Sequence, residues 1–361
     1  MAKYQFVTLL PAESNASAGT KTVPINIVDP ISKIVIINKN TNGSSEKTAH
    51  PAADISKIEL IDGSTVLWSL SGKEVQALDF YDAGYMPDNF YSDQAAAMSF
   101  CTFNLNFGRK LWDPLYAFDP SKFRAPELRI THNYQTADSA STASTLEVHA
   151  HAFDAKKITP AGFLAAREIK TYLTGSSGTI EQVDLPRDQI IRQLIIHGRG
   201  DTYFPWAVAN HLKLIEDGKT VPFDFATTNW LKFINQRYPM AIEKCYLTNS
   251  GAARHMFCAP TFTIAPELIG VTAGTIVTQT PVNGSVPLHV VANQSSLIYG
   301  QVAGWNPHFG FPVPFGDQDD PDDWYDPSGI QKTLRLEVTA GSAGGTGYVD
   351  IVAETVQKNG Q

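Results

Sequence analysis

Cysteine, long apolar runs and export signals are all scarce in this sequence. Its 361 residues include three cysteines, Cys101, Cys245 and Cys258. An odd number without a recognisable spacing argues against a disulfide framework and predicts reduced, structural thiols. No window reaches the roughly 18 consecutive apolar residues of a membrane-spanning helix. Residues 1–21 lack the apolar core of a secretory signal, so we expect a protein that is made inside the cell.

Basic residues are also in deficit. Lysine and arginine number 28 against 36 aspartates and glutamates, which gives a formal net charge of −8. Nucleic-acid-binding proteins usually carry a basic face, so direct nucleic-acid binding is not expected. The hydrophobic content of 43% is typical of a globular chain, and this length is sufficient for two domains, each with its own core.

Catalytic signatures are missing as well. The sequence contains no Gly-x-Ser-x-Gly elbow, phosphate loop, Cys-x-x-Cys pair or zinc-protease helix. Serine, histidine and aspartate are frequent, but a triad is recognised by geometry and not by sequence position. We therefore assign no catalytic, cofactor-binding or metal-binding residue, and we expect a protein that is not an enzyme. A two-domain β-sandwich hydrolase or a bicupin is the alternative, because a fold does not fix a function.

Strand patterns dominate what is present. In 333–340, Leu334, Leu336 and Val338 fall on one face while Arg335 and Glu337 fall on the other. This alternation indicates an antiparallel strand with one buried and one solvated face. Similar β-branched patterns occupy 31–40, 145–153 and 347–356.

Helical patterns are few and short. Three stretches favour helices: 72–85, 226–238 and 160–173. The third leads into the linker-like run "TGSSGT". We therefore predict an N-terminal domain at 1–158, a linker with a short helix at 159–180, and a C-terminal domain at 181–361. The C-terminal domain carries larger loop insertions at about 239–315.

The sequence repeats itself. An alternating strand runs into Asp62-Gly63 and again into Asp217-Gly218, and in each case one residue and then Thr-Val follow. Upstream, "ISKIVIINKN" (31–40) matches "IRQLIIHGRG" (191–200). Before the turn, Ile58-Glu59-Leu60 corresponds to Leu212-Lys213-Leu214 if one residue is bulged between the strand and the turn.

The order of landmarks is also kept after the turn. Each copy continues with a short amphipathic helix, in which Val75 and Leu78 correspond to Leu231 and Ile234. Each then has a Leu-Arg strand, a loop of small residues and a last alternating strand. This is a divergent internal duplication, too long in period for a solenoid. It predicts an all-β chain of two tandem eight-stranded jelly rolls with a few short helices. An immunoglobulin-like tandem would have shorter units.

Three segments carry a resemblance to a known family: "KIELIDGSTVLWSLSG" (57–72), "FGRKLWDPLYAFDPSKFRAPELRITHN" (107–133) and "VDLPRDQIIRQLIIHG" (183–198). Together with the duplicated rolls, they resemble the double-jelly-roll major capsid proteins of icosahedral, often membrane-containing viruses and bacteriophages. The resemblance implies a structural protein that forms homotrimers of pseudo-hexagonal outline, because three chains present six similar rolls. It offers no catalytic residues.

The same resemblance implies partners and a location. We expect the chain to contact itself in the trimer and in neighbouring capsomers, and to meet vertex and minor capsid proteins. In some members the N-terminal arm touches an internal viral membrane, although residues 1–21 show neither an amphipathic helix nor a basic cluster. The expected location is the virion shell, assembled from protein made in the host cytoplasm. The insertions at 239–315 would rise outward as towers.

His149-x-His151 has the spacing with which a cupin begins a metal site. A cupin would also need a glutamate four or five residues later and a third histidine on a later strand. The sequence continues instead with "FDAKKITP". Two histidines on one solvated strand face account for the pair.

Arg199-Gly200-Asp201 matches a tripeptide that some adhesive proteins use to bind integrins. The same residues suit a turn after the strand "IIRQLIIH". We interpret the tripeptide as a turn, because so short a word recurs by accident.

The run "GDQDDPDDWYD" (316–326) concentrates aspartates, whose hard oxygen ligands suit Ca²⁺. Its spacing is not that of an EF-hand, and charge runs are usually solvated loops. Calcium binding at 316–326 is retained as a hypothesis.

Four tryptophans suggest a third hypothesis for the function. Trp112, Trp206, Trp305 and Trp324 could serve a carbohydrate-binding adhesin if they were exposed. Buried or interface packing is the commoner fate of this residue.

Overall fold

The computed structural model describes residues 3–43, 47–92, 95–154, 158–200, 203–249, 254–269, 276–279, 286–291 and 296–360. In these residues antiparallel sheets predominate, and the few helices are short. No helix in this part of the chain is long and apolar enough to cross a bilayer. The all-β prediction is confirmed.

The first half of the chain forms one jelly roll. Its elements are β1 (Lys3–Ser14), β2 (Ala18–Pro24), β3 (Ile31–Thr41), η1 (Pro51–Asp54), β4 (Ile55–Asp62), β5 (Thr65–Leu70), α1 (Gly72–Ala83), β6 (Phe90–Ser92), β7 (Met98–Asn106), η2 (Pro120–Lys122), β8 (Pro126–Asn133) and β9 (Ala143–Asp154). Strands β1-β9-β3-β7 form one sheet and β2-β8-β4-β5 form the other.

The second half repeats this topology. Its elements are β10 (Phe163–Leu173), β11 (Ile180–Asp184), β12 (Ile191–Arg199), α2 (Pro205–Val208), β13 (Ala209–Glu216), β14 (Thr220–Ala226), α3 (Thr227–Arg237), β21 (Gly310–Pro314), η4 (Pro321–Asp323), η5 (Pro327–Gly329), β22 (Leu334–Ala340) and β23 (Tyr348–Gln357). The sheets are β10-β23-β12-β21 and β11-β22-β13-β14. Strand for strand this is the order of the first half, so the prediction of two eight-stranded jelly rolls is confirmed.

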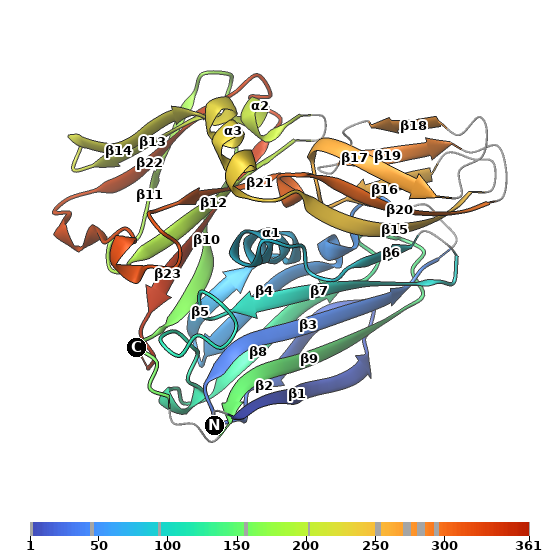
Figure 1. Ribbon diagram of the computed structural model, residues 1–361, viewed down its shortest axis with the longest axis horizontal. Helices are drawn as coiled ribbons and strands as arrows, with labels where there is room; N and C mark the ends of the chain where they lie inside the picture. Colours follow the sequence, from blue (N-terminus) through green and yellow to red (C-terminus); the bar gives the residue numbers. More distant parts are fainter. Residues whose placement is uncertain are drawn as a thin grey trace.

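Additional strands lie between α3 and β21. They are β15 (Ala241–Asn249), β16 (Arg254–Cys258), β17 (Phe262–Ile269), β18 (Ile276–Gln279), β19 (Val286–Val291) and β20 (Ser296–Trp305), followed by η3 (Pro307–Phe309). Strand β15 pairs in parallel with β6, so β15, β20 and β17 extend the first roll's β1-β9-β3-β7 sheet, while β16, β19 and β18 form a separate sheet. In Figure 1 this part projects to one side, beyond α1.

The repeated Asp-Gly turns have the same role in both rolls. The Asp62 carboxylate accepts hydrogen bonds from the backbone N–H groups of Arg124 and Ala125, just before β8. The Asp217 carboxylate accepts the corresponding bonds from Lys332 and Thr333, just before β22. Each aspartate thereby joins its hairpin to the next strand of its sheet, which explains why the same residue stands at both turns.

One expected helix is a strand. Residues 160–173, assigned above to a helix in the linker, contain β10, which pairs with β23 from Phe163 to Leu173. Arg167 of β10 also pairs in parallel with Ser69 of β5. The helix-forming run Ala-Ala-Arg-Glu is overridden because both edges of the segment find strand partners. We propose that the second roll begins at β10, and the division into domains stays a prediction.

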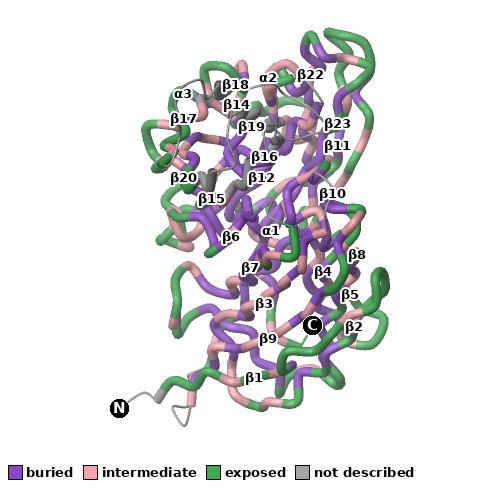
Figure 2. Tube along the Cα trace, turned by 90° about the vertical axis from the view of Figure 1, so that its right-hand side faces the viewer, coloured by how far each residue is buried: buried purple, intermediate pink, exposed green. Residues whose placement is uncertain are grey.

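The two rolls share their packing. The larger apolar cluster contains Ile34, Leu60 and Phe103 of the first roll together with Ile195 and Val352 of the second. A second cluster fills the interior of the second roll. Helix α1 lies between the two halves (Figure 1), and buried residues concentrate around it (Figure 2).

Candidate functional site

The junction between the rolls contains buried charges. Arg192 on β12 donates a hydrogen bond of 2.6 Å to Asp82 of α1 and another of 2.8 Å to Glu354 of β23. Gln193 donates to the same two carboxyl groups. The side chains of Arg192, Asp82 and Glu354 are at most 4% exposed. Burial and the nearby Glu354 raise the pKa of Asp82 to about 8, although Arg192 opposes this shift.

A chain of side-chain hydrogen bonds continues the junction toward β15. His308 of η3 contacts Gln76 of α1 at 3.0 Å, and Gln76 donates to Asn89 at 2.9 Å. Asn89 donates to Glu243, which lies 2.7 Å from His50. All five residues are buried. Burial alone would raise the pKa of Glu243, but the charge and hydrogen bond of His50 leave it below its usual value. The network ties the first roll to β15 and η3, and η3 contacts the second roll through the His308 carbonyl, which lies 3.1 Å from His197 Nδ1.

A cavity of about 320 Å³ opens beside this network of hydrogen bonds. Lys73 and Glu74 line it from α1, and Glu168, Arg199 and Asp350 line it from the second roll. Burial, and to a smaller extent the positive charge of Arg199, lowers the pKa of Lys73 to about 8. Burial and Glu74 raise the pKa of Glu168 to about 7. Ser71 also lines the cavity, and its hydroxyl donates a 2.7 Å hydrogen bond to the Glu74 carboxylate at the start of α1.

Arg199 belongs to the integrin-like tripeptide. Its guanidinium contacts the Asp350 carboxylate, donating a bond of 2.8 Å from Nη2. This ion pair holds Arg199 at the junction between the rolls. Asp201 lies outside the described residues, so the turn interpretation of the tripeptide stays a prediction.

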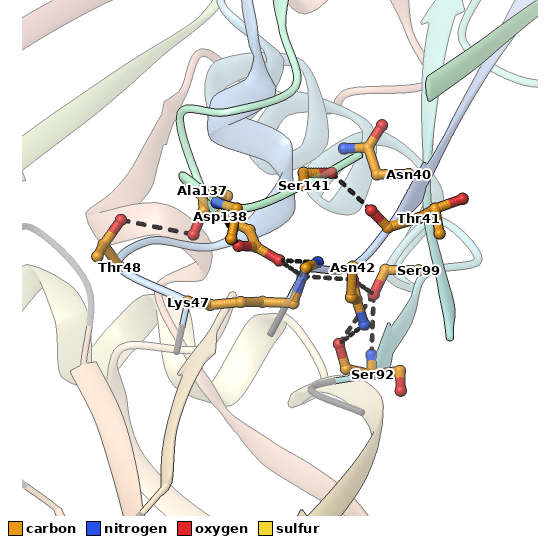
Figure 3. A network of polar contacts seen from close by, with 12 residues as sticks. Asn40, Thr41, Asn42, Lys47, Thr48, Ser92, Ser99, Ala137, Asp138 and Ser141 are labelled. Carbon is orange, nitrogen blue, oxygen red and sulfur yellow. Dashed lines mark hydrogen bonds and ion pairs between the residues drawn. The ribbon is translucent and has the colours of Figure 1, made fainter. Parts of the chain in front are cut away.

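A second polar network lies at one end of the first roll (Figure 3). Lys47, which is 4% exposed, donates a 2.7 Å hydrogen bond to the Asn42 side-chain oxygen and lies 4.0 Å from Asp138. The Asn42 amide donates to the Ser92 carbonyl, and Ser99 donates to both. These contacts join the segment after β3 to the facing ends of β6 and β7 and to the loop before β9. A buried lysine of this kind requires such partners.

The two histidines of the sequence motif lie on the outer face of β9. Phe6 of β1 stacks on His149 with ring centres 4.8 Å apart and meets the edge of His151 at 5.1 Å. Tyr4 packs on Trp112 at 4.2 Å. We call these five side chains the aromatic patch. Phe6 is 60% exposed and Tyr4 51%. In the described part of the chain, no group of three His, Cys, Asp or Glu side chains is placed to hold a metal ion.

Three of the six aspartates of 316–326 cap the turns that follow them. Asp317, Asp320 and Asp326 accept hydrogen bonds from backbone N–H groups two residues further on. These contacts fix η4 and η5. Calcium binding at 316–326 stays a hypothesis.

The four tryptophans do not form a common surface. Trp324 is buried, and its indole donates to the Asp317 carbonyl at 3.0 Å. Trp206 packs on Phe262, and Trp112 and Trp305 are partly buried. Trp324 does not meet the condition of exposure that the adhesin alternative requires, because the Arg192 guanidinium and the Tyr116 ring cover it.

The sequence interpretation missed the junction residues. The signal that could have found them is the strand "IRQLIIHGR", where Arg192, Gln193 and His197 interrupt a run of Ile and Leu. A strand that buries one face should carry polar residues at every second position, whereas this run has apolar residues on both faces. Polar residues in such a strand must find buried partners.

Comparison with known structures gives whole-chain matches. The major capsid protein of Sulfolobus Turreted Icosahedral Virus (STIV) matches with a TM-score of 0.61 at 10% identity, over 98% of this chain and 96% of that one. The major capsid protein P2 from Bacteriophage PM2 matches with a TM-score of 0.54 at 9% identity, over 99% and 98%. The PBCV-1 virus capsid protein matches with a TM-score of 0.58 at 11% identity, over 100% and 96%.

At these identities the likeness is one of fold, and the chain has the double-jelly-roll fold of these proteins. The resemblance predicted from the sequence is therefore confirmed. No family model and no curated protein matches the sequence.

Proposed function

We propose that this chain is a major capsid protein, a structural subunit that assembles into pseudo-hexameric homotrimers and then into an icosahedral virion shell. The observation that carries this proposal is the extent of the structural match. Three double-jelly-roll capsid proteins align with the chain over nearly the whole length of both partners. The chain therefore has both rolls of a capsid subunit, joined in the same order.

The internal junction supports the same function. A shell subunit must hold its two rolls in one fixed relation, because every capsomer presents them to its neighbours in the same way. The buried ion pairs of Arg192 and the network from His308 to His50 meet that need. Each of these buried groups has its partner on the other roll, on β15 or on η3 and would be left uncompensated without it, so the arrangement requires the two rolls in this one relation.

Further partners follow from the shape of the proposed trimer. A ring of six similar rolls does not fit a five-fold vertex, so we propose that other proteins fill the vertices and contact this subunit. Minor capsid proteins between capsomers and an internal membrane beneath them belong to the same proposal. The subunit would be made in the host cytoplasm and reside in the virion.

The first test is the mass of the purified protein by light scattering after size exclusion. Each chain has a mass of 39.4 kDa, so a trimer is expected at about 118 kDa. Electron microscopy of the concentrated trimer should then show hexagonal outlines or closed shells. A monomer at all concentrations that remains folded would contradict the capsid proposal.

A further inference from the structure

The two rolls differ in what covers their equivalent helices. Helix α1 is buried from Glu74 to Tyr81, because the second roll packs against the side that faces away from the first roll's own core. Helix α3 occupies the same place in the second roll, but only Thr227, Leu231 and Ile234 of its side chains are buried. Phe233 is 51% exposed. A surface that is covered in one roll is therefore open in the other.

The position of Phe233 identifies this surface. Since Leu231 and Ile234 take the places of Val75 and Leu78, Phe233 takes the place of Ala77. Ala77 faces the second roll, where a methyl group added to Gly310 would lie 3.2 Å from its Cβ. By this equivalence, Phe233 lies on the surface of the second roll against which a third roll, from another molecule, could pack as the second packs against the first.

The matching surface is found through strand register. In the first roll Phe6 of β1 lies opposite His151, and in the second roll Ala166 of β10 lies opposite Glu354. His151 and Glu354 are equivalent because β3 and β12, which match in sequence, pair with them at the same place. Phe6 is therefore the counterpart of Ala166.

The counterparts differ sharply in exposure. Ala166 and Leu164 are each 1% exposed, whereas Phe6 and Tyr4, which stand at the same two positions of the first roll, are 60% and 51% exposed. Strand β12 is buried on both faces, while β3 alternates between buried and half-buried residues. The outer face of the first roll thus lacks the cover that its counterpart has.

The strand edges agree with this comparison. Within the chain β5 meets β10 in parallel at Ser69 and Arg167. By the same registers, Asp224 of β14 is the counterpart of Ser69, and Val7 of β1 is the counterpart of Arg167. Both β14 and β1 are outer strands of their sheets among the residues that the structure describes. Each has one free edge, and the two lie at opposite ends of the molecule (Figure 1).

We propose that a second copy of this chain supplies the missing cover. Strand β14 and helix α3 of one copy pack against strand β1 and the outer face of β1-β9-β3-β7 of the next, as β5 and α1 pack against the second roll within the chain. This interface rests on the proposed capsomer and specifies its contact surfaces. A head-to-tail contact of this kind is heterologous and closes into a ring when the rotation allows it.

The chemistry of the two surfaces suits assembly after folding. Phe233 and the 41% exposed Val221 stand on one side, and Tyr4 and Phe6 of the aromatic patch stand on the other. The first roll has Ser32 where β12 has Arg192. The contact between copies therefore buries aromatic surface without a charged triad to desolvate.

Two substitutions test the interface by light scattering. Phe6→Asp and Phe233→Asp each place a charge on a surface that is solvated in the single chain, so at a dilution where the wild type is also monomeric the melting temperature of each variant should stay near that of the wild type. We expect each variant to elute as a monomer at concentrations where the wild type is a trimer. The control is Ile269→Asp, a 68% exposed apolar residue on β17, in a part of the chain without a counterpart in the first roll; it should remain trimeric.

A disulfide tests the register. Neighbouring strands lie about 4.8 Å apart, within the Cα separation that a disulfide spans, so Val7→Cys combined with Asp224→Cys should give a covalent trimer on oxidation. Either single variant should give none, because the three native thiols are buried.

The outcomes separate the interface from the function. A wild-type trimer that persists in both aspartate variants, or that forms no disulfide, overturns the interface and leaves the capsid proposal standing. A folded wild-type monomer overturns the capsid proposal and the interface with it.

Discussion

Arg192 and Asp82 are 110 residues apart in sequence, yet their side chains meet at 2.6 Å with neither more than 4% exposed. Asp82 lies near the end of α1 in the first roll, and Arg192 lies on β12 in the second. Glu354 of β23 shares the same guanidinium nitrogen at 2.8 Å. One cation therefore compensates two acidic groups where the rolls meet.

Replacing Arg192 should lower the free energy of unfolding. Arg192→Met keeps much of the side-chain volume but leaves Asp82 and Glu354 facing each other in a buried site. Breaking a buried ion pair from one side costs about 3–5 kcal/mol. We expect the midpoint of denaturant unfolding, followed by tryptophan fluorescence, to fall accordingly.

Two further variants control this result. Arg335→Met removes an ion pair with Asp184 whose side chains are 37% and 75% exposed, and it should cost less than about 1 kcal/mol. Adding Asp82→Asn and Glu354→Gln to Arg192→Met removes the uncompensated acids and should recover most of the loss. Equal effects of Arg192→Met and Arg335→Met would show that the buried position of Arg192 is irrelevant.

Close packing between the rolls gives a second prediction. A Cβ added to Gly310 would lie 2.8 Å from the His197 ring and 3.2 Å from Ala77. The backbone of Gly310 is extended, with φ of −80°, so alanine meets no conformational strain there. Gly310→Ala should therefore destabilise the protein by about 1–3 kcal/mol through overpacking alone.

The matched control is Gly329→Ala. No atom lies within 4 Å of a Cβ added at Gly329. Its substitution should change the free energy of unfolding by less than about 0.5 kcal/mol. If Gly310→Ala melts at the wild-type temperature, the two rolls are not held as closely as the distances indicate.

Local chemistry made the duplicated roll predictable from the sequence. The Asp-Gly turns need a left-handed backbone, and φ is 61° at Gly63 and 70° at Gly218. The extra residue of the second copy lies in its turn and not in a bulge before it, because Asp62 pairs with Thr65 whereas Glu216 pairs with Thr220; the register shift after Leu214 has a counterpart after Leu60. The two Leu-Arg pairs that appeared equivalent in sequence, which begin at Leu128 and Leu334, lie on the expected strands. In the structure they differ by two residues in register, because Leu128 lies opposite Leu60 whereas Leu336 lies opposite Leu214. A shift of two keeps the same face, so the pattern could not reveal it.

The junction could not be predicted in this way. Its contacts join positions more than 100 residues apart, such as Gln76 with His308 and His50 with Glu243. Periodicity reports which face of a strand is buried, but it does not report which element covers that face. Strand β10 shows the same limit, because its two strand partners decided its conformation.

Buried histidine gives a third prediction, at acidic pH. Burial lowers the pKa of His197, although Asp350 and the hydrogen bond to the His308 carbonyl oppose this shift. The unfolded chain takes up the proton near pH 6.5 and the folded chain resists it, so stability falls as the pH drops below that value. His197→Asn retains a donor for the carbonyl but does not titrate. Relative to the wild type, its melting temperature should rise between pH 6.5 and pH 5. A constant difference would show that His197 takes no part in acid unfolding.

Asp54 should have the opposite effect on the pH dependence of stability, favouring the folded protein at acidic pH. Burial raises its pKa from 3.8 to about 7, against hydrogen bonds from Ala137 and Asn40 that lower it. The folded chain then holds a proton that the unfolded chain releases, so this contribution to stability is complete below pH 3.8 and is lost as the pH rises to about 7. The slope for one group is at most about 1.4 kcal/mol per pH unit.

Asp54→Asn mimics the protonated carboxyl group, and the Asn40 amide can turn to accept from it because its oxygen has no hydrogen-bond partner among the residues that the structure describes. The variant should gain stability over the wild type as the pH rises from 5 to 7, measured as the difference between their denaturant midpoints at each pH. Asp326→Asn is the control, because hydrogen bonds from Ser328 lower the pKa of that exposed carboxylate. Its difference from the wild type should stay constant over this range. A constant difference for Asp54→Asn as well would mean that Asp54 is ionised in the folded protein throughout, with its charge balanced inside the first roll.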